Sequence, residues 1–167
     1  ATHCLARAGG HGDLLSQVAT GELSLACAFG ERQARHELFN VTTKALRDDG
    51  HYVIDGAKTG VLHGAQAGQW IVSARTSGAA RDTQGIALFV LPVDTPGVSV
   101  RDMRSNDGMR MANIDLRQVR VPESRVYVVG GRRLDATFLS SLVLPAGTRA
   151  LLWIASEKNS PESGRLV

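Results

Sequence analysis

Alternating apolar and polar positions dominate the chain from Glu22 to about Val129. Short runs rich in β-branched residues recur there, and Gly, Asp, Asn and Pro separate them at close intervals. This pattern predicts strands, and the short connections favour antiparallel pairing, because parallel βαβ units need long amphipathic helices between strands. We therefore predict a mainly β fold, an antiparallel β-barrel or sandwich with short helical segments at its ends. The predicted strands are Leu23–Phe29, Val41–Arg47, His51–Val61, Trp70–Arg75, Ile86–Leu91, Val98–Met103 and Ile114–Val121.

Two turn sequences support this interpretation. Asp48-Asp49-Gly50 separates two alternating runs, and its Asp-Gly step tolerates the positive φ that a tight hairpin needs. Asp94-Thr95-Pro96-Gly97 predicts a second turn, in which Pro96 fixes φ and Gly97 is free to take the strained position.

The two ends of the chain have different patterns. In residues 1–21, Leu14, Leu15 and Val18 have helical spacing, which predicts one short helix with Asp13 as N-cap and Gly21 as its stop. In residues 130–167, Pro145 and Gly147 interrupt an apolar run, and a polar tail follows. We expect an N-terminal helical segment (1–21), a β-domain (22–129) and a partly helical tail (130–167).

Composition excludes several classes of function. The 167 residues are enough for one core, and no apolar run is long enough to span a bilayer. A net charge of +3, with acidic residues close to most basic ones, argues against nucleic-acid binding. Two cysteines, Cys4 and Cys27, form no disulfide framework, and no signal peptide is visible, so we expect a cytoplasmic protein. Because the first residue is Ala1, the chain is expected to be a processed product or a piece of a longer one.

The order of the segments from Gly21 to Gly130 resembles the middle β-domain of the acyl-CoA dehydrogenase family. No one segment is specific, but the full set stands in the family's order and spacing. The matching segments are Thr20-Gly21-Glu22, Phe29-Gly30-Glu31, Val41-Thr42-Thr43-Lys44-Ala45, the run from Asp49 to Lys58, Ile71 to Arg75, Phe89 to Val98, Asp107-Gly108-Met109-Arg110, and Ile114 to Pro122.

The resemblance implies a domain that packs one edge against FAD and helps to line an acyl-CoA pocket. It assigns Phe29, Gly30, Gly60, Val61 and Leu62 to flavin contact. Backbone groups there would meet the polar edge of the ring, and apolar side chains its face. The resemblance also assigns His36, in the polar loop after Glu31, to substrate binding.

The chain departs from the common family pattern at these positions. Most members have Thr at the position of Gly30 and a Trp-Ile-Thr/Ser run at Gly60-Val61-Leu62, so hydroxyl groups that face the flavin are absent here. Backbone N–H groups are expected to remain available. The runs Arg35-His36-Glu37-Leu38 and Val61-Leu62-His63-Gly64 resemble small subunits of pimeloyl-CoA dehydrogenase-like enzymes.

Family chemistry requires a carboxylate base that removes the α-proton of the thioester, while a hydride leaves the β-carbon for flavin N5. In the family this base comes from a C-terminal helical domain, which residues 130–167 do not resemble. Nothing places Glu157 or Glu162 beside a substrate. We name no catalytic residue, leave enzyme status open, and expect this chain alone to be inactive without its helical domains or a partner subunit.

Other candidate groups have simpler interpretations. His3, Cys4 and His11 match no zinc-ligand spacing, so no metal site is predicted. His63 is either a cofactor or substrate contact or an exposed loop residue. Arg110 could bind a phosphate or order a loop. Since arginines often brace loops, we expect the structural role. The two tryptophans, Trp70 and Trp153, are expected in the core or an interface.

Two hypotheses remain from the sequence. The chain is either the FAD-binding middle domain of an acyl-CoA dehydrogenase-like oxidoreductase or a non-catalytic structural or partner-binding β-domain that has lost the cofactor. In either case, faces that helical domains cover in the family would expose apolar surface, so we expect a homo-oligomer.

Overall fold

The computed structural model describes residues 1–8, 11–123 and 126–128. The chain divides into a unit of Ala1–Gly130 and a unit of Gly131–Val167. All described residues belong to the first unit. The tail predicted for residues 130–167, with Trp153, Glu157 and Glu162, lies outside the described residues.

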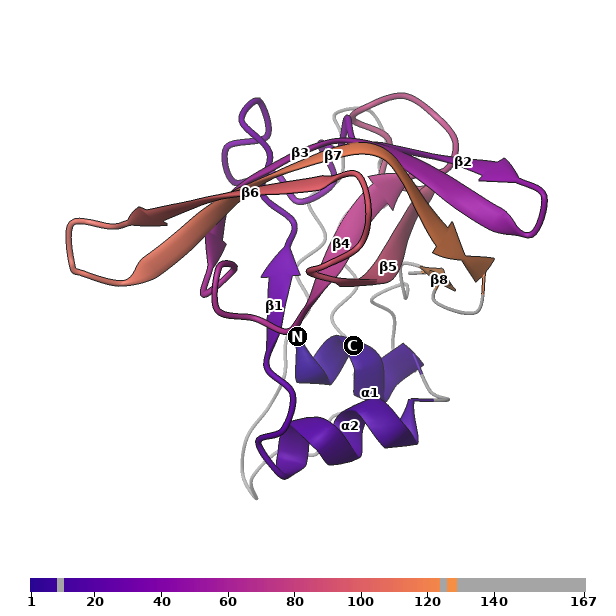
Figure 1. Cartoon of the computed structure of the whole chain (residues 1–167). Helices are drawn as coiled ribbons and strands as arrows, with labels where there is room; N and C mark the ends of the chain where they lie inside the picture. Colours follow the sequence, from indigo (N-terminus) through magenta and orange to yellow (C-terminus); the bar gives the residue numbers. More distant parts are fainter. Residues whose placement is uncertain (9–10, 124–125, 129–167) are drawn as a thin grey trace, which may run out of the picture. The chain divides into compact units, whose positions relative to one another are not determined.

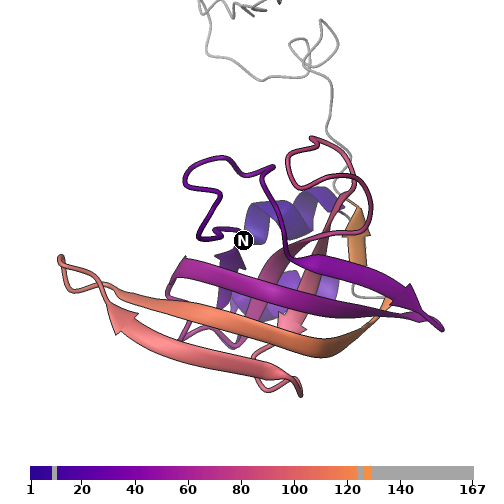
Figure 2. The same cartoon turned by 90° about the horizontal axis from the view of Figure 1, so that it is seen from above.

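Eight strands of the described residues form one curled sheet (Figures 1 and 2). Its order is β6-β7-β3-β2-β4-β5-β8, and β1 pairs with β4 beside this path. The fold is therefore mainly β, as predicted, and each predicted strand has a counterpart. The bounds are β1 Leu25–Ala28, β2 Lys44–Asp48, β3 His51–Leu62, β4 Gln69–Arg75, β5 Ile86–Pro92, β6 Val98–Arg104, β7 Arg110–Pro122 and β8 Val126–Val128.

Strand pairing is antiparallel except at two places. β1 pairs with β4 in parallel, and β2 meets β4 in parallel through the Lys44–Arg75 pair. β1 and β2 run in the same direction, β3 runs in the opposite one, and β4 returns to the first direction, so β4 is parallel to both β1 and β2. Strand β8, which the sequence did not predict, pairs with β5.

Both predicted turns are confirmed by their backbone angles. Asp49 and Gly50 have φ of 41° and 72°, the positive values that a tight β2–β3 hairpin needs. Gly97 has φ of 89°, and the N–H of Val98 donates to the carbonyl of Thr95 at 3.2 Å. The sequence thus places these chain reversals correctly.

The N-terminal segment contains two helices, α1 (Thr2–Ala8) and α2 (Gly12–Ala19), where one was predicted. The prediction of Asp13 as N-cap is wrong: His11 occupies that position, and Asp13 lies in the first turn of α2, where its charge complements the helix dipole. Gly21, at φ of 79°, follows the end of α2 as predicted. The small and glycine-rich sequence around α1 gave no helical pattern from which to predict it.

The core has two parts, one on each face of the sheet. The larger cluster lies inside the curl and includes Trp70, which is fully buried as predicted and donates its indole N–H to the carbonyl of Gly64 at 2.8 Å. The smaller cluster joins both helices to β1, β4 and β5 around Leu5, Ile71 and Val90. Figure 1 shows α1 and α2 together on that face.

Arg75 at the end of β4 holds the surrounding loops. Its guanidinium is buried and donates to six backbone carbonyl oxygens at 2.8–3.3 Å. The acceptors lie in the segment before β2 and in the loop between β4 and β5. They are the carbonyls of Phe39, Val41, Ser77, Ala80, Asp82 and Gln84.

No helix among the described residues is long and apolar enough to cross a membrane.

Candidate functional site

The two stretches predicted for flavin contact lie side by side. The N–H of Thr59 donates to the carbonyl of Gly30 at 2.8 Å, which ties the segment after β1 to the middle of β3. A β-carbon added to Gly30 would lie 2.8 Å from the carbonyl oxygen of Thr59. The absence of a side chain at Gly30 therefore permits this close approach.

A buried ion pair stands next to this contact. The ammonium of Lys58 is 2.6 Å from a carboxylate oxygen of Glu31, and the two side chains are 0% and 2% exposed. Lys58 also donates to the hydroxyl of Ser73 on β4 at 3.0 Å. The pair thus joins the loop after β1 to β3 and β4.

Further hydrogen bonds complete the surroundings of the Glu31 carboxylate. It accepts from the backbone N–H groups of Thr42 and Thr43 at 2.8 and 3.1 Å, and from the Thr42 hydroxyl at 2.6 Å. The carboxamide of Gln33 donates to it at 2.7 Å. Both ends of the segment between β1 and β2 are therefore bound to one buried carboxylate.

The electrostatics of the pair follow from this geometry. Burial alone would raise the pKa of Glu31, but the Lys58 ammonium and the hydrogen bonds outweigh it and lower that pKa from 4.5 to about 2. Burial lowers the pKa of Lys58, and the Glu31 carboxylate opposes that change. A carboxylate held in this state is a poor general base, so Glu31 is suited to structure rather than to proton abstraction.

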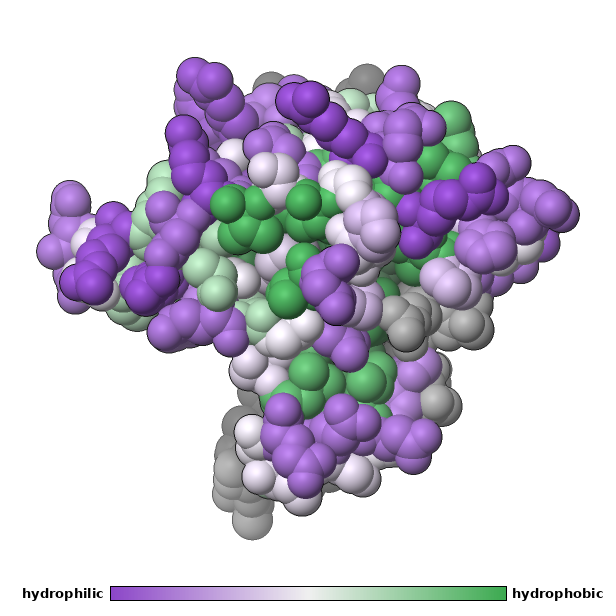
Figure 3. Space-filling view, in the orientation of Figure 1, coloured by the Kyte–Doolittle hydropathy of each residue, from purple (hydrophilic) through white to green (hydrophobic). Residues whose placement is uncertain are grey.

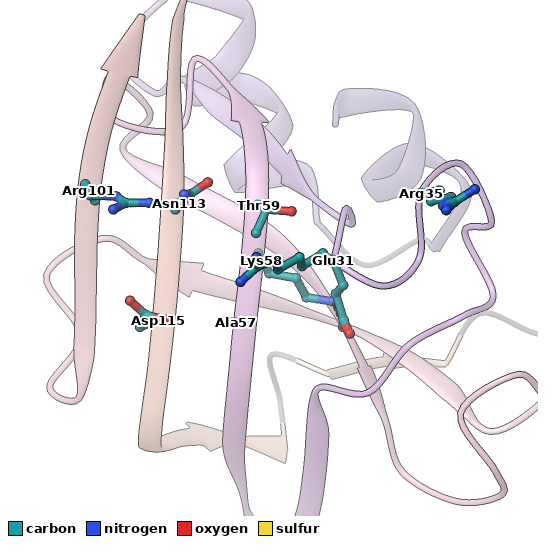
Figure 4. A pocket seen from close by; sticks show the side chains of 9 residues that line it. Glu31, Arg35, Ala57, Lys58, Thr59, Arg101, Asn113 and Asp115 are labelled. Carbon is teal, nitrogen blue, oxygen red and sulfur yellow. Dashed lines mark hydrogen bonds and ion pairs between the residues drawn. The ribbon is translucent and has the colours of Figure 1, made fainter.

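An open depression of about 810 Å³ lies over this pair (Figure 4). β3 runs through it, with Arg35 on one side and Arg101, Asn113 and Asp115 on the other. Arg101 of β6 points across toward Asn113 of β7. The lining residues are Glu31, Arg32, Arg35, Ala57, Lys58, Thr59, Arg101, Asn113 and Asp115.

The lining is rich in positive charge. Lys58 and Glu31 neutralise each other, which leaves the guanidinium groups of Arg32, Arg35 and Arg101 against the single carboxylate of Asp115. Guanidinium groups bind phosphates and carboxylates through paired N–H donors. The depression is therefore suited to an anionic group.

The predicted flavin-contact residues are of two kinds. Phe29 is partly buried against the helix-side cluster, and Val61 is buried in the main core. Gly60 and Leu62 are exposed, and Gly60 has φ of 63° at an irregularity of β3. The N–H of Gly60 donates to the Asn113 carboxamide oxygen at 3.1 Å, so this N–H, expected to be available, already has a partner.

Other candidate residues lie around the site or away from it. His36 is exposed in the loop after Glu31, next to Arg35 but not in the lining of the depression. His63 is exposed with φ of 56°, and its ring nitrogen lies 3.3 Å from the Gln66 amide oxygen. Arg110 braces β6 against β7 through an ion pair with Asp102, the structural role that the sequence favoured. The described residues contain no group of three or more His, Cys, Asp or Glu that could hold a metal.

Sequence reasoning missed the roles of Glu31, Lys58, Arg101 and Asn113. Glu31 and Lys58 stood inside the quoted motifs, but a charged residue is normally exposed, and no pattern indicated that these two meet. Arg101 and Asn113 reach the site only because β6 and β7 pair with Arg101 opposite Asn113.

The chain is also similar in sequence to a known protein family. Residues 26–120 match the model of the acyl-CoA dehydrogenase middle domain. The chain belongs to the acyl-CoA dehydrogenase family. The resemblance stated from the sequence is thus confirmed for the family and for its middle domain.

Several acyl-CoA dehydrogenases are similar to this chain. FadE34 of Mycobacterium tuberculosis is 34% identical over 126 residues, which are 72% of this chain and 17% of that protein. Mitochondrial isovaleryl-CoA dehydrogenase of Pongo abelii is 27% identical over 159 residues, 88% of this chain and 37% of that one. The chain therefore spans less than half the length of each of these relatives.

Solved structures of the family have the same fold. A structure named Tcur3481-Tcur3483 steroid ACAD superposes with a TM-score of 0.66 at 29% identity, over 70% of this chain and 30% of that one. The ChsE4-ChsE5 complex of Mycobacterium tuberculosis gives 0.64 at 25% identity, over 68% and 29%.

The buried pair predicts a specific dependence of stability on pH. Since the pKa of Glu31 is about 2 in the folded chain and near 4.5 unfolded, its stabilisation is complete above about pH 4.5 and is lost as pH falls through 2. We expect this to amount to about 3 kcal/mol. Urea unfolding of the wild type and of Glu31→Gln from about pH 2 to about pH 7 measures it. The variant should be less stable at about pH 7, and its stability should fall less steeply below about pH 4.5. An equally steep fall of the unfolding free energy below about pH 4.5 in both proteins would contradict this role of Glu31.

Gly30 predicts a steric effect. Gly30→Ala should destabilise the chain by roughly 1–3 kcal/mol, because the new β-carbon meets the backbone oxygen of Thr59. Gly12→Ala is the matched control, since a β-carbon there has nothing within 4 Å. Thermal unfolding of both variants measures the difference, and equal stabilities would refute the close approach.

Proposed function

We propose that this chain is the middle domain of an acyl-CoA dehydrogenase-like oxidoreductase and lies against the ring of FAD. The observation that carries the proposal is the contact between Gly30 and Thr59, which places the two predicted flavin stretches side by side. Membership of the family supports the reaction class, which is α,β-dehydrogenation of an acyl-CoA thioester.

The end of β3 that follows Thr59 is compatible with the face of a planar ring. Gly60 has no side chain, and Leu62 is 50% exposed two residues further along β3. FAD, when bound, would accept the hydride. The chain's own contribution would be a surface that orients the ring, with Phe29 and Val61 packed behind it in the two core clusters.

The arginine-rich depression supports an acyl-CoA substrate. Coenzyme A carries phosphate groups. Arg32, Arg35 and Arg101 supply guanidinium donors in the depression, which Thr59 also lines. His36, adjacent to Arg35 on this polar loop, is proposed as a further substrate contact outside the lining of the depression. The runs from Arg35 to Leu38 and from Val61 to Gly64 support the narrower proposal of a pimeloyl-CoA dehydrogenase-like small subunit.

The catalytic base is proposed to come from outside the described residues. Glu31 lies beside the depression, but its carboxylate is engaged by Lys58 and by backbone N–H groups. A base must reach the α-proton with a free lone pair. We therefore propose that the middle domain binds and orients, while another part of the enzyme or a partner subunit abstracts the proton.

Association with further protein surface is part of the proposal. The two structures named above carry paired names, Tcur3481-Tcur3483 and ChsE4-ChsE5. Figure 3 shows apolar surface on the sheet side and on the helix side of this chain, broken by polar side chains. Exposed apolar side chains support a homo-oligomer or a complex with a second subunit. They include Leu38, Phe39, Leu46, Leu62, Val100 and Met109.

A second candidate function is a cofactor-free β-domain that binds a partner. It is favoured by the Gly60 N–H, which donates to Asn113 instead of remaining free for a ligand. It is also favoured by Gly30, where the approach of Thr59 leaves no room for a hydroxyl-bearing side chain. In this case the domain would retain the fold of a flavoprotein, but its role would be limited to a surface that binds the partner.

A flavin titration separates the two candidates. We expect the purified chain to bind FAD with quenching of flavin fluorescence, and Leu62→Asp to weaken binding at least about tenfold, because a carboxylate cannot pack against the ring. Leu46→Asp is the matched control, since Leu46 is 64% exposed on β2 and is not among the proposed flavin contacts. No binding at high micromolar FAD would favour the cofactor-free domain.

The substrate proposal has its own test. Coenzyme A should bind the chain at low salt, and Arg101→Gln should weaken that binding about fivefold, because one guanidinium–phosphate contact is lost. Arg104→Gln, on the same strand but outside the depression, should leave the affinity unchanged. Isothermal titration calorimetry measures both, and equal losses in the two variants would mean that only net charge matters.

A further inference from the structure

The two cysteines of the chain, Cys4 and Cys27, lie on elements that pack together. Cys4 belongs to α1 and Cys27 to β1, 23 positions later in the sequence (27 − 4). Both are partly buried and free. Neither cysteine lines the depression of the candidate site.

The alternation of β1 fixes the side on which Cys27 lies. Ala26 and Ala28 are buried in the main core, so Cys27 faces the opposite side together with Leu25 and Phe29. Leu25 and Phe29 pack against the helix-side cluster, which also includes Cys4. Cys27 is therefore on the face of the sheet that α1 covers.

Register brings the two thiols to the same place. Cys27 is the partner of Ile71 in the β1–β4 pair, and Ile71 is one of the buried residues around which Cys4 packs. The Cys27 thiol is, after burial, one of the groups that raise the pKa of the Cys4 thiol. The two thiols therefore lie on the same face of the sheet, in the region around Ile71.

We propose that Cys4 and Cys27 form a redox-reactive pair that closes to an intramolecular disulfide when the chain meets a small-molecule disulfide. The bond would tie α1 covalently to β1. Because β1 continues directly into Phe29, Gly30 and Glu31, the link would also fix the helical segment to the strand that leads to the candidate site.

The reaction balances as two thiol–disulfide exchanges. One thiolate attacks a sulfur of oxidised glutathione, which forms a mixed disulfide and releases one glutathione thiolate that takes up the proton. The second cysteine thiolate then attacks the protein sulfur of the mixed disulfide and releases the second glutathione. Two protein thiols are oxidised, and one glutathione disulfide is reduced to two thiols.

Partial burial affects the rate of this reaction. Burial and, to a smaller extent, Cys27 raise the pKa of the Cys4 thiol. The reactive thiolate is therefore scarce near neutral pH. The experiment is therefore run at about pH 8.5, where the thiolate fraction is larger. Since the two thiols lie on the same face of the sheet around Ile71, the second exchange should be intramolecular.

The test uses the full chain, first reduced and then incubated with oxidised glutathione. We expect both thiols to disappear in a thiol assay of the denatured protein, with an intact mass about 2 Da below that of the reduced chain. The oxidised protein should remain a single chain on a non-reducing gel. Its melting temperature should rise on the order of 5 °C and return after reduction, because the link restricts the unfolded chain.

Single substitutions provide the matched controls. Cys4→Ser and Cys27→Ser each retain one thiol, and with glutathione each should give either a free thiol or one stable adduct about 305 Da heavier. Neither should show the rise in melting temperature. Persistent adducts on both cysteines of the wild type, disulfides only between chains, or two thiols that stay free would each overturn the proposal.

Discussion

The buried ion pair of Glu31 and Lys58 is the interaction on which the rest of this domain depends. Removing two charges from water costs several kcal/mol for each, and their attraction compensates only when their other hydrogen-bonding groups are also satisfied. Here Ser73 accepts from the ammonium, and backbone N–H groups of Thr42 and Thr43 donate to the carboxylate. The pair therefore holds β3, β4 and the segment before β2 in one arrangement.

The geometry of the candidate site follows from this constraint. Since Glu31 is fixed, the residue before it, Gly30, is held against Thr59, and Gly60 and Leu62 follow Thr59 on β3. The same pair forms part of the depression whose remaining charge is mainly positive. A structural interaction thus positions the groups that are proposed to meet cofactor and substrate, although it does not take part in their chemistry.

The sequence predicted those features that depend on local patterns. Alternation located the strands, and the Asp49-Gly50 step located the β2–β3 hairpin, because both depend on neighbouring residues alone. The parallel β1–β4 pairing and the burial of Lys58 depend on contacts between distant segments, so no local sequence pattern indicated them. For the same reason the bond from the Gly60 N–H to Asn113 became visible only when β7 was placed beside β3.

The loop between β1 and β2 is anchored at both ends by buried cations. Glu31 binds its start to Lys58, and Arg75 binds its final part through the carbonyls of Phe39 and Val41. Between these anchors Arg32, Arg35 and His36 are exposed, and a change there alters the surface without disturbing either buried cation. This separation explains how the exposed residues of this loop can change while the chain retains the middle-domain fold. A new specificity can therefore arise in this loop without loss of the fold.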